Sequence, residues 1–148
     1  MTEQDSKPQF EHHVHVKRRE AFLRRIMQLF EADGLMSVEG TLKECRLPTE
    51  WIVAQNEARG LKPATIWPEL DFLVLKLCPD RVEPIARELV RLGLRGPVIH
   101  IQIEANNSMQ LGAYDHFHPE CVVTGPGVSA QLLQELKQAG TIIGFSPL

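Results

Sequence analysis

Hydrophobic residues recur with clear periods in the second half of this chain. Residues 70–77 are apolar on both faces, which predicts a central strand. Over residues 79–96 the apolar positions fall at helical spacing and form one stripe of Val82, Ile85, Ala86, Leu89 and Val90. Asp80 and Glu83 resemble a capping box at the start of this segment. We therefore predict a buried strand followed by an amphipathic helix.

Strict alternation replaces the helical period after residue 97. Ile99, Ile101 and Ile103 alternate with polar residues, which is typical of a strand with one face on the core and one in solvent. The residues "ANNS" at 105–108 indicate a turn, and a three-residue loop over 106–108 places Ile103 opposite Leu111 and Ile101 opposite Ala113. That register keeps the apolar residues of the hairpin on one face.

The first half of the chain shows weaker patterns. An apolar stripe predicts a helix over 17–32, and residues 49–60 favour a shorter helix with Thr49 as N-cap. Pro63 and Pro68 make the next stretch irregular. Residues 12–16, "HHVHV", suggest a small edge strand, and the polar residues 1–11 a loose arm.

The remaining elements define a fold class. Residues 120–123 suggest a short strand, 141–145 a last strand, and between them a helix begins after Ser129 as N-cap. The order predicts an α+β fold with a ferredoxin-like, mostly antiparallel sheet and helices on one face. A mainly helical segment over 17–61 would precede the sheet and two helices of 70–148, within a single domain spanning 1–148.

Composition excludes several classes of protein. The chain has 148 residues, 43% hydrophobic and 24% charged, with a formal net charge of −3. So small a charge disfavours nucleic acid as a partner. The three cysteines are widely spaced and form no CxxC pair, which favours a reducing compartment. With no apolar run of about 20 residues and no phosphate-binding or nucleophile motif, we expect a cytoplasmic protein with no cofactor and no enzymatic activity.

The stretch "GAYDHFHPECVV" at 112–123 holds the densest set of reactive side chains. His116, His118 and Cys121 are possible ligands of a transition metal, and His100 lies across the hairpin from them. The spacing matches no strong metal motif, and a fourth ligand is not evident. A structural connector, with Phe117 and Cys121 anchored in the core, is the favoured interpretation.

The predicted outer face of the hairpin is a second candidate site. With the loop beside it, this face gathers the polar residues His100, Gln102, Glu104, Gln110, Tyr114, Asp115 and Glu120. Such a surface is either the wet face of an open antiparallel sheet or a place where another protein binds. We take these seven residues as the candidate partner-binding set.

The segment "LGAYDHFHPECVV", followed by a Gly/Pro loop, a helix and "GTIIGF", resembles the C-terminal part of small bacterial immunity-type proteins of toxin–immunity systems. The resemblance implies a compact domain that binds a cognate toxin, for example a basic nuclease-type effector, and blocks its active site. It assigns no role to any single residue. Two alternatives stay open: a metal-binding protein or metal-dependent enzyme using His116, His118 and Cys121, and a ligand-sensing or regulatory ferredoxin-like domain.

Overall fold

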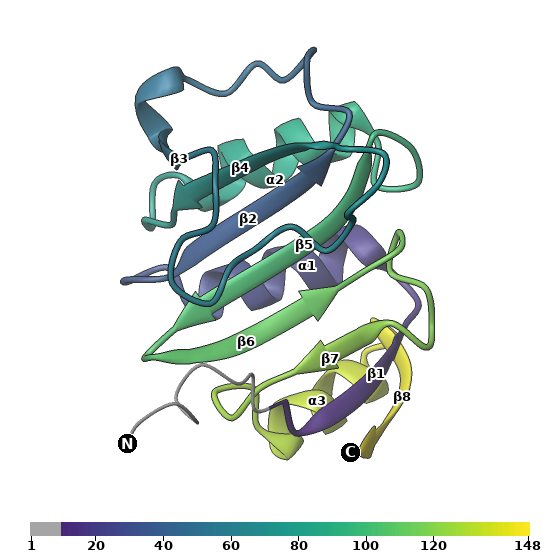
Figure 1. Cartoon of the computed structure of the whole chain (residues 1–148). Coiled ribbons are helices and arrows are strands. Elements are labelled where there is room, and N and C mark those ends of the chain that lie inside the picture. The colour runs from purple at the N-terminus through teal and green to yellow at the C-terminus, as the bar shows by residue number, and fades with distance from the viewer. Residues whose placement is uncertain (1–9) are drawn as a thin grey trace, which may run out of the picture.

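The computed structural model of this chain describes residues 10–148, and its eight strands form one antiparallel sheet (Figure 1). The strands are β1 (His12–Val16), β2 (Leu35–Gly40), β3 (Ile52–Ala54), β4 (Asp71–Lys76), β5 (Val98–Ala105), β6 (Ser108–Ala113), β7 (Val122–Thr124) and β8 (Ile142–Pro147). The helices are α1 (Arg19–Leu29), α2 (Val82–Leu92) and α3 (Ala130–Gln138). Across the sheet the order is β3-β4-β2-β5-β6-β7-β1-β8.

The sheet contains the same arrangement twice. Strands β4 and β5 are joined through α2 and lie on either side of β2, antiparallel to it. Strands β7 and β8 are joined through α3 and flank β1 in the same way. Helix α1 connects the two central strands, and β6 joins the two units within the sheet. This sheet does not confirm the ferredoxin-like order, but it does confirm an α+β fold.

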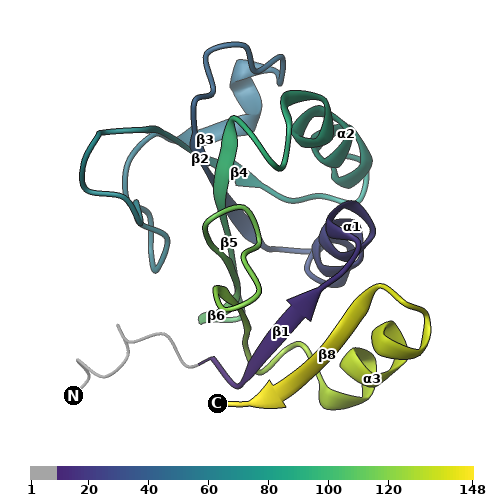
Figure 2. The ribbon, with the colours of Figure 1, turned by 90° about the vertical axis from the view of Figure 1, so that its right-hand side faces the viewer.

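The two faces of the sheet are covered differently. All three helices lie on one face, as predicted for α2 and α3, while the long connection between β3 and β4 crosses the other (Figure 2). We call residues 55–70 of this connection the strap. None of the helices in the described part of the chain is long and apolar enough to cross a membrane.

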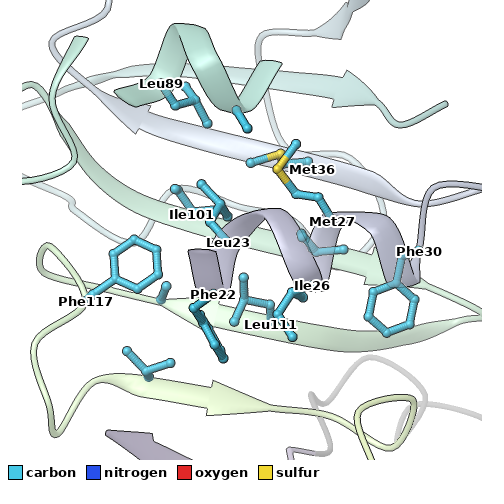
Figure 3. Close-up of a cluster of buried hydrophobic side chains, with 14 of the residues drawn as sticks. Phe22, Leu23, Ile26, Met27, Phe30, Met36, Leu89, Ile101, Leu111 and Phe117 are labelled. Atoms are coloured by element: carbon cyan, nitrogen blue, oxygen red, sulfur yellow. The ribbon is translucent and has the colours of Figure 1, made fainter. Parts of the chain in front are cut away.

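The main hydrophobic core fills the space between the sheet and the helices. Helix α1 supplies its centre, and the side chains of Phe22, Leu23, Ile26 and Met27 are fully buried. They pack against apolar residues of β2, β5 and β6, which include Met36, Ile101 and Leu111 (Figure 3). Leu89 joins them from α2. Burial of this apolar surface is the main contribution to the stability of the fold.

The predicted hairpin register is confirmed, but the turn differs from the expectation. Ile103 pairs with Leu111 and Ile101 with Ala113. The turn has two residues instead of three, since Ala105 pairs with Ser108, and both asparagines adopt positive φ angles of 56° and 61°. A bulge then leaves Gln110 as the extra residue on β6. The bulge restores the register that a two-residue turn alone would shift.

Several predictions for the first half of the chain are wrong. Residues 49–60 form a single 3-10 turn and β3, and residues 35–40 form a strand in the middle of the sheet. The apolar stripe over 17–32 does form a helix, α1. Residues 12–16 form a strand as expected, but it lies inside the sheet, between β7 and β8. Residues 1–9 of the predicted arm lie outside the described residues.

Two helix caps test the capping predictions. Ser129 caps α3 as expected, because its side chain accepts a hydrogen bond from the Leu132 N–H at 3.1 Å. The capping box before α2 is wrong, because the N-cap is Arg81 and no side chain caps the helix. Glu83 instead binds Arg24 of α1, at 2.9 Å from Oε1 to Nε. Because Glu83 forms this ion pair between α1 and α2, its side chain does not complete a capping box.

Candidate functional site

A buried carboxylate fixes the middle of the strap. Glu39 of β2 is 2% exposed, and its two oxygens accept hydrogen bonds from the backbone N–H groups of Ala64 at 2.8 Å and Thr65 at 3.1 Å. Hydrogen bonds to an ionised acceptor are stronger than neutral ones, and a buried charge is tolerated only when it is satisfied in this way. The strap is therefore attached to the sheet by its main chain at this point.

Gln102 of β5 makes a second attachment. Its side-chain oxygen accepts hydrogen bonds from Ser37 Oγ at 2.9 Å and from the backbone N–H of Lys62 at 3.3 Å. Its amide nitrogen donates to the Tyr114 hydroxyl at 3.0 Å. The Gln102 side chain thus connects β2, the strap and the residue after β6. It is only 7% exposed.

Tyr114 reaches Gln102 because Gly112 leaves room for its ring. A Cβ atom at position 112 would lie 2.6 Å from Cε2 of the tyrosine, closer than real Cβ contacts occur. Gly112 pairs with Gln102 in the sheet, so the ring lies over the glycine and places its hydroxyl beside the amide. Burial raises the pKa of Tyr114, although the Gln102 contact opposes the shift. The hydroxyl therefore stays protonated at neutral pH.

The structure corrects the expectation that this face of the hairpin lies in solvent. Gln102, Glu104 and Gln110 are 7%, 6% and 2% exposed. The strap covers Gln102. Glu104 has Arg59 of the strap as its ion-pair partner, at 3.6 Å. Gln110 sits at the bulge, where it donates to the Ala105 carbonyl and accepts from the Gly127 N–H. These three side chains act inside the molecule, whereas the partner-binding role of the set stays a prediction.

His100 connects the strap with the turn that follows β6. Its Nδ1 accepts a hydrogen bond from the backbone N–H of Asp115 at 3.0 Å, and its Nε2 lies 2.8 Å from Thr65 Oγ1. Its ring lies 5.8 Å from that of Tyr114. The structure thus brings three of the predicted residues, His100, Tyr114 and Asp115, to the same place as the strap.

The turn itself has an unusual backbone. Asp115, His116 and Phe117 have φ angles of 55°, 59° and 61°, a left-handed conformation that costs an L-residue roughly 1–2 kcal/mol. Surrounding contacts hold it: the His116 N–H donates to Ile99, and Phe117 is buried in edge-to-face contact with Phe22 at 6.4 Å. Strained backbone persists only where neighbours determine it, and such places concentrate at binding and switch regions.

The strap carries the most exposed apolar residues that the structure describes. Ile66 is 94% exposed and Trp67 85% exposed, and they directly follow Thr65, which the sheet holds. We call these two residues the tip. Sequence analysis missed it, because the flanking prolines were taken only as marks of irregular structure. An Ile-Trp pair in a segment without periodicity was the available indication.

The metal interpretation of residues 112–123 receives no support from the geometry. His116 Nε2 lies 2.8 Å from the Gly96 carbonyl, and His118 Nδ1 accepts from the Glu120 N–H at 3.1 Å. Over residues 10–148, no group of three or more His, Cys, Asp or Glu side chains is placed to hold a metal ion. Cys121 is a free thiol, partly buried, as are the other two cysteines.

A cavity of about 400 Å³ opens at the base of the strap. Apolar atoms of Leu42 and Phe72 line it together with the charged side chains of Lys43, Glu69 and Asp71. Asp71 already accepts a hydrogen bond from the Leu42 N–H at 2.8 Å. The cavity is large enough for a small molecule.

Comparisons with protein-family models, with curated proteins and with solved structures find no match to this chain. Function therefore has to be argued from the strap, the tip and the turn.

Proposed function

We propose that this chain is a protein-binding module and that its partner docks on the tip of the strap. The observation that carries the proposal is the exposure of Ile66 and Trp67 on a loop whose backbone is fixed at Thr65. Tryptophan is enriched among the residues that dominate binding energy. A loop already held in place loses little conformational entropy when a partner binds it, which favours affinity.

The residues around the tip suggest the chemistry of the partner. His100 and Asp115 follow Thr65 in one chain of hydrogen bonds, and the exposed acids Glu69 and Glu120 lie in the strap and the neighbouring turn. A complementary surface would offer an apolar pocket for the indole, bordered by basic groups. Opposite charges of this kind raise the association rate and exclude wrong partners.

A cytoplasmic immunity protein fits this description. Its cognate toxin, for example a basic nuclease-type effector, would receive the tip in or beside its active site and lose access to substrate. The resemblance of residues 111–145 to immunity-type proteins supports this choice of partner. Gln102 and Glu104 would contribute indirectly, by holding the strap, while Tyr114, Asp115 and Glu120 would contact the toxin.

The test is a titration against the product of the gene adjacent to the one encoding this chain. We expect a stable complex with the wild type and at least about 30-fold weaker binding by Trp67→Ala, which corresponds to a hot spot of about 2 kcal/mol. Ile143→Ala removes an exposed apolar side chain from the far edge of the sheet, where Ile143 is 53% exposed, and should bind like the wild type. Absence of a complex, or equal effects of both substitutions, would reject the proposal.

The cavity at the base of the strap favours a second candidate function, the sensing of a small ligand. A panel of metabolites screened by thermal shift would test it. A hit should raise the melting temperature of the wild type, and Lys43→Ala should reduce the shift because Lys43 lines the cavity. A panel without hits, or a shift that Lys43→Ala leaves intact, would count against this function.

A further inference from the structure

Among residues 10–148, His100 is the one side chain that bonds both to the strap and to the left-handed turn at 115–117. A backbone N–H donates to its Nδ1, so that nitrogen must carry a lone pair. The ring is then neutral with its proton on Nε2, which donates to Thr65 Oγ1 at 2.8 Å. The observed contacts are consistent with only one of the three protonation forms of the ring.

The groups around the ring decide how easily it takes up a second proton. Glu39 faces it from β2, where the two residues pair, and Asp115 and His116 face it from the turn. Burial lowers the pKa of His100 below the ordinary value of 6.5; the two acids oppose this shift and His116 adds to it. Tyr114, protonated at neutral pH, contributes no charge. The strap contributes Thr65, which does not titrate.

We propose that His100 is a latch that acid opens: a proton on Nδ1 ends its hydrogen bond from Asp115, the strained turn relaxes, and the strap is no longer tied to it. The protonated ring presents an N–H to the N–H of Asp115, so one of the two groups must move. The turn is poised for this change because Asp115 and His116, at its exposed end, leave an unfavourable backbone region when they are released. Phe117 and its contact with Phe22 limit the movement to the exposed end of the turn.

The latch depends on the proposed function only in its effect on partner binding. If the tip binds a partner, opening the latch loosens the surface and weakens binding in acid. Tyr114 and Asp115 would then lose their fixed positions beside the strap. The latch itself is a property of the free chain and is measured there.

The first experiment is a pH titration of the free chain from 7.5 to 5.0 by NMR. We expect the His100 ring to titrate below 6.5. The NMR signals of the Asp115 amide and of the Thr65 side chain should change with the same midpoint. Hydrogen exchange at the Asp115 amide, which donates to His100 Nδ1, should accelerate by about tenfold for each unit by which the pKa of His100 is lowered, after correction for its intrinsic pH dependence. Unchanged Asp115 and Thr65 signals while the ring titrates would overturn the latch.

A pair of variants separates His100 from the other histidines. In His100→Asn the side-chain oxygen can take the place of Nδ1 and accept from Asp115 at every pH, so the transition at the turn should disappear. His15→Asn removes an exposed histidine of β1 and should leave the transition unchanged. A transition that persists in His100→Asn would contradict the proposal, and if that variant does not fold, the wild-type titration decides alone.

Partner binding supplies a separate readout. The complex with the adjacent-gene product should be weaker at pH 5.5 than at pH 7.5 for the wild type, and the difference should be smaller for His100→Asn. Failure to bind at both pH values would reject the proposed function, while the NMR titration would still decide the latch.

Discussion

The two faces of this sheet are closed by different proportions of apolar and polar contacts. The helix-covered face is closed by apolar side chains, such as Phe22 and Ile101, which meet one another and exclude water. The strap-covered face is closed by a smaller apolar cluster, in which Leu61 of the strap is fully buried, and by polar contacts of Glu39 and Gln102 with backbone N–H groups of the strap. On the first face a loss of contact costs the stability of the whole chain. On the second it costs stability as well, and it also releases a loop from its position.

The difference between the two faces indicates where exposed binding residues can be placed without loss of the fold. Apolar packing is not directional, so a helix on the first face tolerates changes in its outer residues but offers no fixed apolar projection. Hydrogen bonds are directional and hold the strap at defined points, so residues beyond those points can remain exposed in a fixed place. Ile66 and Trp67 are such residues, and the helix-covered face has no counterpart among the described residues.

The largest effect should come from truncating a buried aromatic on the helix-covered face. Phe22→Ala should lower the free energy of unfolding by about 3–5 kcal/mol, because the fully buried ring leaves a cavity against Phe117. Trp67→Ala removes an even larger ring and should change it by less than about 0.5 kcal/mol, because the indole is 85% exposed. Urea denaturation measures both. Similar losses for the two variants would show that the tip is packed and not presented.

The next largest effect should come from the carboxylate beneath the strap. Glu39→Gln should lower the free energy of unfolding by about 1.5–3 kcal/mol, because one backbone N–H group keeps only a neutral acceptor and the other is left facing an amide donor. Hydrogen exchange should accelerate at Ala64 and Thr65 and stay unchanged in α1. Glu57→Gln, an exposed acid of the strap, serves as the matched control. Unchanged exchange at the two amides would mean that other contacts hold the strap.

Acid should affect the two faces in different pH ranges. The pKa of His100 is lowered by burial, so its contribution to stability is complete above about 6.5 and is lost as the pH falls through the lowered value. On the helix side the hydrogen bond from Arg91 lowers the pKa of Glu88 from 4.5, so that contribution is complete above 4.5 and is lost only in stronger acid. Exchange measured against pH should therefore rise first in the strap and later around α2. The reverse order would contradict the assignment of both groups.

The smallest effect should come from the ion pair at the strap surface. Arg59 Nη1 lies 3.6 Å from Glu104 Oε1, and the arginine is 60% exposed, so Arg59→Gln should cost less than about 1 kcal/mol. Lys62→Gln, at a neighbouring exposed site of the strap, is the control, and urea denaturation again gives the difference. A loss well above 1 kcal/mol would mean that the charge of Arg59 is needed to keep Glu104 buried.

Local periodicity made parts of this fold predictable. The hairpin register followed from keeping Ile101 and Ile103 on one face, and the helix at 82–92 from its apolar stripe. The strand at 35–40 was missed because its polar residues, such as Ser37 and Glu39, are buried beneath the strap. Alternation between apolar and polar residues says which residues share a face, but not whether that face meets water.

The candidate site was predictable only in part. His100, Tyr114 and Asp115 were chosen from their place beside the hairpin, and the structure places them together. The strap that reaches them comes from a segment far away in the sequence and is held through its backbone N–H groups, which every residue except proline possesses. No side-chain pattern marks such contacts, so the attachment of the strap could not be predicted, although the Ile-Trp pair of the tip was visible in the sequence.

The most direct test of the account is to locate the partner on the surface of the chain. Amide and indole NMR signals recorded with and without the adjacent-gene product should change most at Ile66, at the Trp67 indole and at Asp115. Signals from the outer surfaces of α1, α2 and α3 should stay where they are. Changes confined to those helices, with the indole of Trp67 unaffected, would contradict the central claim that the strap-covered face is the one that binds.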